Sequence, residues 1–425
     1  MSKKVTVAKL IEKIEGEATL KFHFVHEKID FVDIVFSSSR GIEQILKGRP
    51  AQDALVINPR VCGICGHAHL IATVKALEAC YPQIEISPKA EMIRELTLSF
   101  ELIQNHMKWF YLTLLPLAGM EQQVLRAAAF SQLISKAIAH LAGQYPHNSY
   151  AIVGGVVCEP THIELLHVRN TIKETIAFFE KYMVRADTKA LIKCEKVETL
   201  LEKEGDLPAL LHTVLEKGWQ HIGKSFDRFI VFGESSYFKR GKSLKTRIQP
   251  HIHEKFIEES ENSDSLAKNV SYKQKYYEVG PLSRAMLRKT PLIKDAHRRY
   301  GDSVFSRIMA RSCEAIQLLY HAEDLLSRID LSQPSYIEPS VAISTVSGEG
   351  TGSVEAARGS LIHKVKLHEG VISDYTLITP TQWNLSQGTP DVPGIAQQAM
   401  IGLNDEKTAE FVFKTFDVCS VCTTH

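Results

Sequence analysis

Two pairs of cysteines near opposite ends of the sequence have the spacing of metal ligands. Cys62 and Cys65 form one Cys-x-x-Cys pair, and Cys419 and Cys422 form the other in a chain of 425 residues. Two thiolates at this spacing can bind one metal from a single turn. The pairs of a small zinc module lie roughly 12–20 residues apart, whereas here most of the chain intervenes. We therefore predict that the fold brings both pairs to one metal centre.

Four thiolates are soft ligands, so they suit nickel, zinc or an iron–sulfur centre and not magnesium or calcium. The principal alternative to a catalytic centre is therefore a structural zinc site with four cysteine ligands. The remaining cysteines are isolated in the sequence, and we expect them to be small buried side chains; they are Cys80, Cys158, Cys194 and Cys313.

Composition excludes several classes of protein. The chain has 50 basic and 49 acidic residues and a net charge of +1, which gives no reason to expect nucleic-acid binding. No apolar run reaches the roughly 18–20 residues that span a bilayer, and no apolar segment typical of a signal peptide follows the N-terminus. Eight cysteines in a chain of this length indicate a reducing compartment. We expect a cytoplasmic protein, with any membrane association made through partners.

Hydrophobic periodicity predicts the elements that must position the cysteines. Apolar stripes at helical spacing predict long helices over 67–80, 88–116, 121–142, 161–182 and 302–328. Alternating sequence predicts strands within 5–38 and 361–380, and the charged run 258–264 is interpreted as a solvated loop. We predict one domain over 1–425 of the α+β class, predominantly α. It has a core of long helices in a bundle, an N-terminal β-hairpin or sheet and smaller peripheral β elements.

The two cysteine motifs, with their neighbours, resemble those of a known family. Arg60 to Cys65 followed by His69 resembles the N-terminal signature of the large subunit of [NiFe]-hydrogenases, and Cys419, Cys422 and His425 resemble its C-terminal signature. The resemblance covers nearly the whole chain. Val418 stands where many members have proline, a variant that we associate with the compact uptake and sensory branches of the family.

The resemblance implies a nickel–iron centre. All four cysteines would bind nickel, with Cys62 and Cys419 terminal and Cys65 and Cys422 bridging to an iron that carries CO and cyanide. The implied activity is the reversible oxidation of H2 to protons and electrons. Because the sequence has no further cysteine cluster, the electrons would pass to a small subunit with iron–sulfur clusters. Higher oligomers of such heterodimers are allowed. A regulatory H2 sensor with the same centre is the alternative within the family.

Four further residues take roles around the centre by the same resemblance. Glu15 would carry protons to and from a terminal cysteine, for which a carboxyl group with a pKa raised by burial is suited. Arg358 would lie over the open metal position and pair with Asp417, and its guanidinium offers fixed donors and a permanent charge. His69 would donate a hydrogen bond to a cysteine sulfur. Asn105 stands where the family usually has a second acidic partner of the arginine.

A separate magnesium site is also implied. Glu43, the backbone carbonyl of Leu377 and the side chain of His425 would be its ligands. One carboxylate, one carbonyl and one histidine suit Mg²⁺, because this ion prefers octahedral coordination and keeps several waters.

Overall fold

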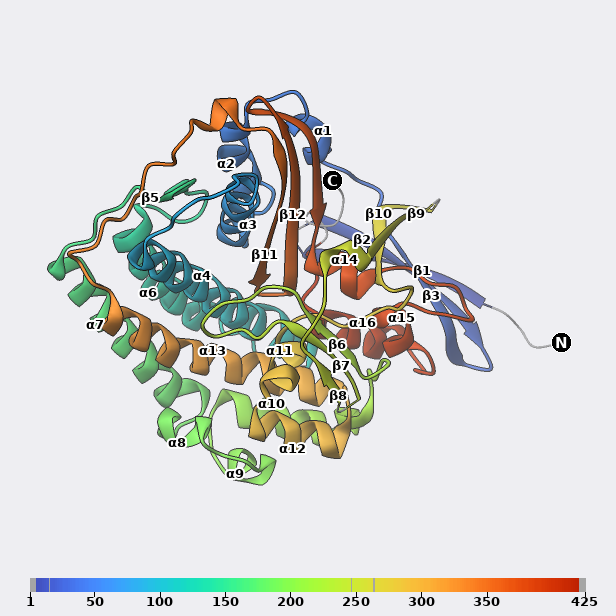
Figure 1. Ribbon diagram of the computed structural model, residues 1–425. Coiled ribbons are helices and arrows are strands. Elements are labelled where there is room, and N and C mark those ends of the chain that lie inside the picture. The colour runs from blue at the N-terminus through green and yellow to red at the C-terminus, as the bar shows by residue number, and fades with distance from the viewer. Residues whose placement is uncertain (1–4, 15, 246, 263, 420–425) are drawn as a thin grey trace.

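The structure is a computed structural model that describes residues 5–14, 16–245, 247–262 and 264–419. Long helices fill one side of the molecule, and small antiparallel sheets lie beside them (Figure 1). This arrangement confirms the predicted α+β class with a predominance of helix. It also confirms the predicted long-helix core with an N-terminal sheet.

The helix bundle is built from α4 (Pro88–Lys108), α6 (Val124–Ala142), α7 (His162–Phe178) and α13 (Val304–Arg328). Helices α4 and α7 both pack on α6 and on α13. Helix α4 continues through a π-helical turn, η3 (Trp109–Leu114), into α5 (Leu115–Leu117), so the prediction of one long helix over 88–116 is confirmed with an irregular last turn. Helix α7 continues in the same way into η4 (Phe179–Met183).

Shorter helices connect and cover the bundle. They are α1 (Ile42–Leu46), α2 (Ala54–Ile57), α3 (Gly66–Glu78), α8 (Thr188–Ile192), α9 (Val197–Leu201), α10 (Asp206–Glu216), α11 (Pro281–Arg288), α12 (Pro291–Tyr300), α14 (Pro380–Leu385), α15 (Ile395–Met400) and α16 (Glu406–Thr415). Single 3₁₀ turns lie between them at η1 (Ala51–Asp53), η2 (Asn58–Arg60), η5 (Trp219–His221), η6 (Glu254–Phe256) and η7 (Ile343–Thr345).

All of the paired strands in the described part of the chain are antiparallel neighbours in sequence. The sheets contain β1 (Val5–Ile14), β2 (Gly16–Val25) and β3 (Lys28–Val35); β4 (Ala151–Ile152) and β5 (Gly155–Val156); β6 (Arg228–Val231), β7 (Gly241–Leu244) and β8 (Arg247–Gln249); β9 (Ile257–Asn262) and β10 (Ser265–Tyr272); and β11 (Gly348–Ala356), β12 (Gly359–His368) and β13 (Val371–Ile378). The loop predicted over 258–264 was wrong, because 257–262 form β9 paired with β10. Backbone pairing forms this hairpin, and its charged side chains still reach solvent.

Strand β11 supports α3, the helix that follows the first cysteine pair. A Cβ atom at Gly350 would lie 2.0 Å from the carbonyl oxygen of Ala76, and one at Gly352 would lie 2.2 Å from that of Ala72. Glycine at alternate positions therefore lets the helix backbone lie directly on the strand. This close contact fixes where α3 begins, and hence where Cys65 lies.

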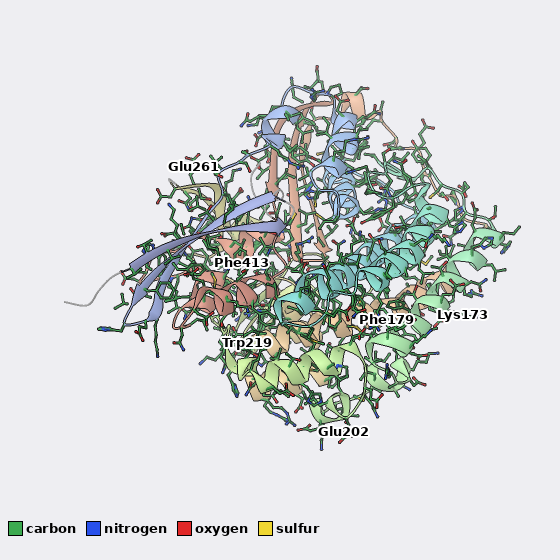
Figure 2. All side chains as sticks on the ribbon, turned by 180° about the vertical axis from the view of Figure 1, so that it is seen from behind. Lys173, Phe179, Glu202, Trp219, Glu261 and Phe413 are labelled. Atoms are coloured by element: carbon green, nitrogen blue, oxygen red, sulfur yellow. The ribbon has the colours of Figure 1, made fainter. Side chains whose placement is uncertain are left out.

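The C-terminal segment returns to the bundle. The indole Nε1–H of Trp109 donates to the carbonyl oxygen of Lys414 at 2.8 Å, which ties the end of α16 to η3. Seen from the opposite side, Phe413 and Phe179 lie within the molecule, whereas Lys173 and Glu202 lie at its edge (Figure 2). One large apolar cluster of buried residues extends from Ala18 to Cys419 and includes the cysteines discussed below.

Candidate metal centre

Three of the four predicted cysteines converge in the structure. Cys62, Cys65 and Cys419 are buried, and their sulfur atoms all lie within 4.8 Å of one another. The Sγ atoms of Cys62 and Cys419 are 3.5 Å apart although 357 positions separate these residues in sequence. Cys422 lies outside the described residues. Two segments that are far apart in the sequence thus meet, and their thiols form a compact set of soft donors.

The turn that carries Cys62 and Cys65 is held from several elements. The Nδ2 group of Asn105 on α4 donates to the carbonyl oxygen of Ile64 at 2.6 Å, and the hydroxyl of Tyr145 donates to the same oxygen at 3.2 Å. Gly66, the first residue of α3, lies so close to η2 that a Cβ atom would be 2.4 Å from the carbonyl oxygen of Pro59. The cysteines therefore lie on a turn whose backbone is fixed on both sides.

Glu101 holds the start of α3. Its carboxylate accepts the backbone N–H groups of His67 and Ala68 at 2.8 and 3.0 Å. The side chain is fully buried, and burial raises the pKa of Glu101 to about 8, although these two N–H donors oppose the rise. The charge of Cys62 raises this pKa further and that of Arg358 lowers it, so Glu101 is close enough to the centre to respond to its charge.

Helix α14 holds the backbone at Cys419. The backbone N–H of Cys419 donates to the Thr381 hydroxyl at 3.3 Å. Two residues earlier, Asp417 has a positive φ of 55°, which turns the chain before it reaches Cys419. Val418, between Asp417 and Cys419, is buried.

Arg358, Arg311 and Asp417 form a group of buried charges that we call the canopy. Arg358 donates through Nε to the carbonyl oxygen of Asp417 at 2.7 Å and through Nη2 to its Oδ1 at 3.3 Å. Arg311 donates through Nη1 to Oδ2 of the same carboxylate at 2.9 Å. The predicted contact between Arg358 and Asp417 is therefore present, and Arg311 adds a second arginine. Asn105 takes no part in it.

The pKa of Arg358 responds to the charges of the cysteines as well as to that of Asp417. Burial alone would lower the pKa of Arg358, but the charge of Asp417 and then those of Cys419, Cys65 and Cys62 raise it well above its usual range. Its Nη1 group is buried and has no hydrogen-bond partner among the described residues. A buried guanidinium donor without a partner is costly, and such a group indicates an acceptor that belongs at this place.

His69 is held in a chain of buried polar groups. Its Nδ1 atom lies 3.1 Å from Nε2 of His363, whose Nδ1 atom lies 2.8 Å from the hydroxyl of Tyr375 and 3.1 Å from that of Thr73. Burial lowers the pKa of His69 to about 4, with the charge of Cys62 acting in the opposite direction. His69 is therefore a neutral ring fixed in orientation beside the first cysteine pair.

Glu43 lies next to Leu377, the residue whose carbonyl oxygen is predicted to be a further magnesium ligand, and contacts its backbone N–H. Its Oε1 accepts the backbone N–H of Leu377 at 2.8 Å. Its Oε2 accepts the ammonium group of Lys268 at 2.7 Å, a partner that the sequence did not suggest. His425 and Glu15 lie outside the described residues, so the magnesium site and the proton relay stay predictions.

Several residues at the site were not predicted from the sequence. Arg311 lies on the buried face of α13 that Val304 and Ile308 also share, at helical spacing. A charged residue within an apolar stripe is the signal that could have identified it. Glu101 is also buried, on α4, but it lies beside the apolar stripe of that helix and not within it, so its sequence gave no such signal.

Comparisons with known proteins agree over most of the chain. A model of the nickel-dependent hydrogenase family matches residues 40–117 and 232–425. The chain is 24% identical to the sulfhydrogenase 1 subunit alpha of Pyrococcus furiosus over 98% of this chain and 96% of that one. It is also 24% identical to the periplasmic [NiFeSe] hydrogenase large subunit of Desulfomicrobium baculatum, over 92% and 88% of the two chains. The Ni-Fe-Se hydrogenase structure from D. vulgaris Hildenborough in the oxidised state has a TM-score of 0.85 at 21% identity, covering 100% of both chains.

Proposed function

Because the chain belongs to the nickel-dependent hydrogenase family and is a hydrogenase large subunit, we propose that it catalyses the reversible oxidation of H2 to protons and electrons. The observation that carries the proposal is the buried set of Cys62, Cys65 and Cys419 near Arg358, whose Nη1 donor has no partner among the described residues. The soft thiol donors fit a nickel–iron centre. The unpaired donor of Arg358 fits an iron that carries acceptor ligands.

In this proposal all four cysteines would hold nickel, and Cys65 and Cys422 would also hold iron. When bound, the centre supplies the heterolytic cleavage of H2, with CO and cyanide on the iron. A structural zinc site with four cysteines would explain the thiols alone. It has no open position and gives no role to the buried guanidinium beside it. The canopy is thus the feature that favours the catalytic centre over zinc.

The chain's own residues keep the site dry and handle charge and protons. Cys62 and Cys419 are fully buried, which excludes water and strengthens every electrostatic interaction around them. Arg358 and Asp417 hold a fixed pair of charges above the thiols. Neutral His69, whose Nδ1 lies 3.1 Å from Nε2 of His363, would donate to a cysteine sulfur through its other nitrogen. We propose Glu15 as the group that takes the proton, since a carboxyl group with a raised pKa can both accept and release it.

Electrons must leave through another polypeptide in this proposal. Among the described residues, the three cysteines are the one group of metal-ligating side chains that lie close enough together to hold an ion. We therefore propose a small subunit with iron–sulfur clusters as the partner of this chain, with the chain itself as a single domain. No helix in the described part of the chain is both long and apolar enough to cross a membrane.

We also propose a hard cation at Glu43, with the carbonyl oxygen of Leu377 and the side chain of His425 as further ligands. The contact between Glu43 and the backbone of Leu377 supports it. Lys268 competes for the same carboxylate. The Lys268 side chain is 32% exposed, so a bound cation could displace its ammonium group into solvent. Magnesium in a fixed ratio to nickel in the purified protein would support the site.

Infrared spectroscopy and metal analysis of the protein purified with its partner test the main proposal. We expect nickel and iron in about equal amounts, infrared bands of CO and cyanide, and H2-dependent reduction of an artificial dye. Stoichiometric zinc without these bands would refute it. CO and cyanide bands without H2-dependent dye reduction would instead favour the alternative of a regulatory H2 sensor.

A further inference from the structure

The canopy contains two arginines for one carboxylate. Arg311 and Arg358 are both buried, and both donate to Asp417, one to each carboxylate oxygen. Two positive charges against one negative charge leave the canopy with a formal charge of +1. An arginine that only balanced Asp417 would be redundant, because Arg358 already pairs with it.

Arg311 is held from behind by a neutral histidine. Its Nη1 lies 3.1 Å from Nδ1 of His106, and Nε2 of His106 lies 2.9 Å from Oε2 of Glu314. Arginine can only donate, so Nδ1 of His106 must accept and Nε2–H must donate to the carboxylate. Burial lowers the pKa of His106 to about 4, which keeps the ring in this neutral form. The histidine therefore orients Arg311 without adding a charge.

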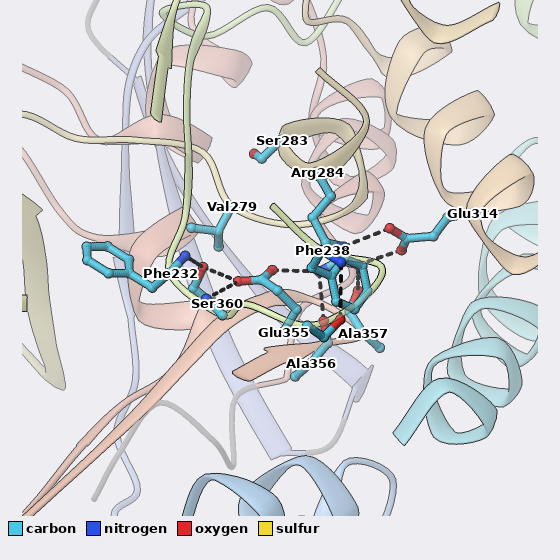
Figure 3. Close-up of polar contacts among 12 residues, drawn as sticks. Phe232, Phe238, Val279, Ser283, Arg284, Glu314, Glu355, Ala356, Ala357 and Ser360 are labelled. Carbon is cyan, nitrogen blue, oxygen red and sulfur yellow. Dashed lines mark hydrogen bonds and ion pairs between the residues drawn. The ribbon is translucent and has the colours of Figure 1, made fainter. Parts of the chain in front are cut away.

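The acid behind the histidine is neutralised by other groups. Glu314 accepts two hydrogen bonds from Arg284, at 2.8 and 2.6 Å, and Arg284 also donates to Glu355 at 3.0 Å (Figure 3). Glu355 in turn accepts from Ser360 at 2.6 Å. One arginine between two carboxylates leaves this outer group with a formal charge of −1, and its hydrogen-bonded link to Arg311 runs through the neutral His106 ring. Burial lowers the pKa of Arg311 to about 10, opposed by the charge of Asp417 and, more weakly, by that of Glu314. The nearest carboxylate that Arg311 contacts is thus Asp417, on the side of the cysteines.

We propose that Arg311 is a further positioning residue of the metal centre: it locks Asp417 in place and adds a positive charge to the canopy. The proposal rests on the proposed function, since it concerns a nickel–iron centre beneath these residues. Arg311 fixes Asp417 from one side, and the Nη1 group of Arg358, which has no partner among the described residues, is available to a ligand. The added positive charge stabilises electron-rich states of the centre.

The test compares Arg311→Met, Arg311→Lys and a matched control. Arg311→Met removes the charge, so the CO and cyanide bands should move to lower wavenumber and the midpoint potential of the centre should become more negative. Arg311→Lys keeps the charge and should restore most of the shift in potential. The control is Arg94→Met. Arg94 is buried and pairs with Glu78, away from the canopy, so we expect lower thermal stability with unmoved bands.

A second pair of variants covers the case in which Arg311→Met does not assemble the centre. His106→Asn can still present an acceptor near the position of Nδ1, whereas His106→Leu cannot. We expect shifted bands in the leucine variant and wild-type bands in the asparagine variant. Wild-type band positions in Arg311→Met would overturn the proposal. If Arg311→Met does not assemble the centre, wild-type band positions in both His106 variants would overturn it instead. Absence of CO and cyanide bands from the wild-type protein would instead refute the proposed function itself.

Discussion

Replacing Gly352 by alanine should displace the helix that carries Cys65. The new Cβ atom would lie 2.2 Å from the carbonyl oxygen of Ala72 and 2.5 Å from the backbone nitrogen of Ala76, both in α3. Ordinary van der Waals contact begins at 3.4 Å, so helix and strand must separate by about 1 Å. Backbone atoms cannot turn aside as a flexible side chain can. Overpacking of this kind costs about 1–3 kcal/mol of stability.

The same displacement should reach the metal centre, because α3 begins at Gly66, directly after Cys65. A misplacement of about 1 Å can lower the rate of a catalytic step by about 10²-fold. We therefore expect Gly352→Ala to lower the melting temperature, the nickel content per chain and H2-dependent dye reduction together. Thermal unfolding followed by circular dichroism, metal analysis and the dye assay measure the three effects.

Gly348 provides a matched control on the same strand. A Cβ atom there would lie 2.9 Å from the carbonyl oxygen of Cys80, which lies beyond the end of α3. The required shift is smaller and does not act on the helix itself. Gly348→Ala should therefore keep most of its nickel. Equal nickel content and melting temperature in Gly352→Ala and wild type would show that the contact between α3 and β11 does not position the cysteines.

Three further predictions concern buried groups near the site. Burial raises the pKa of Glu101 in the folded state from 4.5 to about 8, so the stability that its protonated form contributes is present below pH 4.5 and is lost as the pH rises to about 8. The melting temperature of the wild type should therefore fall between these pH values, and Glu101→Gln should make that fall smaller. Tyr375→Phe removes a hydroxyl 2.8 Å from Nδ1 of His363 and should lower the free energy of unfolding, measured by chemical denaturation, by about 1–3 kcal/mol. An unchanged free energy of unfolding would show that water replaces the hydroxyl. Lys268→Met leaves the buried Glu43 without its ammonium partner, so the variant should melt lower than wild type and regain stability with added Mg²⁺; an unchanged response to Mg²⁺ would count against a cation at Glu43.

The long helices could be predicted because their side chains repeat at the helical period. The stripe that includes Phe100, Ile103 and Met107 is buried as expected, and α13 behaves in the same way. The convergence of Cys62 with Cys419 could be predicted from the chemistry of paired thiols, although no local pattern connects them. Helical periodicity and the spacing of metal ligands can both be recognised in one sequence without knowledge of the fold.

Strand β11 could not be predicted, because its glycines contradict strand propensity. Gly348, Gly350 and Gly352 alternate along it, and glycine is depleted from strands. These glycines are needed because α3 packs closely on the strand. This tertiary contact cannot be read from the sequence of β11. Strand β9 was missed for a related reason, since its charged residues read as a loop until its partner β10 is known.

Arg311 illustrates a harder limit. Its partner Asp417 lies 106 positions away, and an ion pair at that separation leaves no trace in either local sequence. The sequence shows only that a charged residue interrupts an apolar stripe, which predicts a buried partner but not its identity. The resemblance to hydrogenases named Arg358 and Asp417 but gave no role to Arg311, so the second arginine came from the structure alone.

One continuous helical segment links both cysteine pairs. Glu101 and Asn105, one turn apart on α4, hold the backbone around the first pair. His106, the next residue, contacts Arg311 of the canopy, and Trp109, one turn beyond Asn105, holds the end of α16 before the second pair. Polar groups at intervals of four residues on a buried helix therefore set the distance between two parts of the chain that are remote in sequence. Because a helix is rigid along its axis, it can hold this distance more firmly than either cysteine turn could alone.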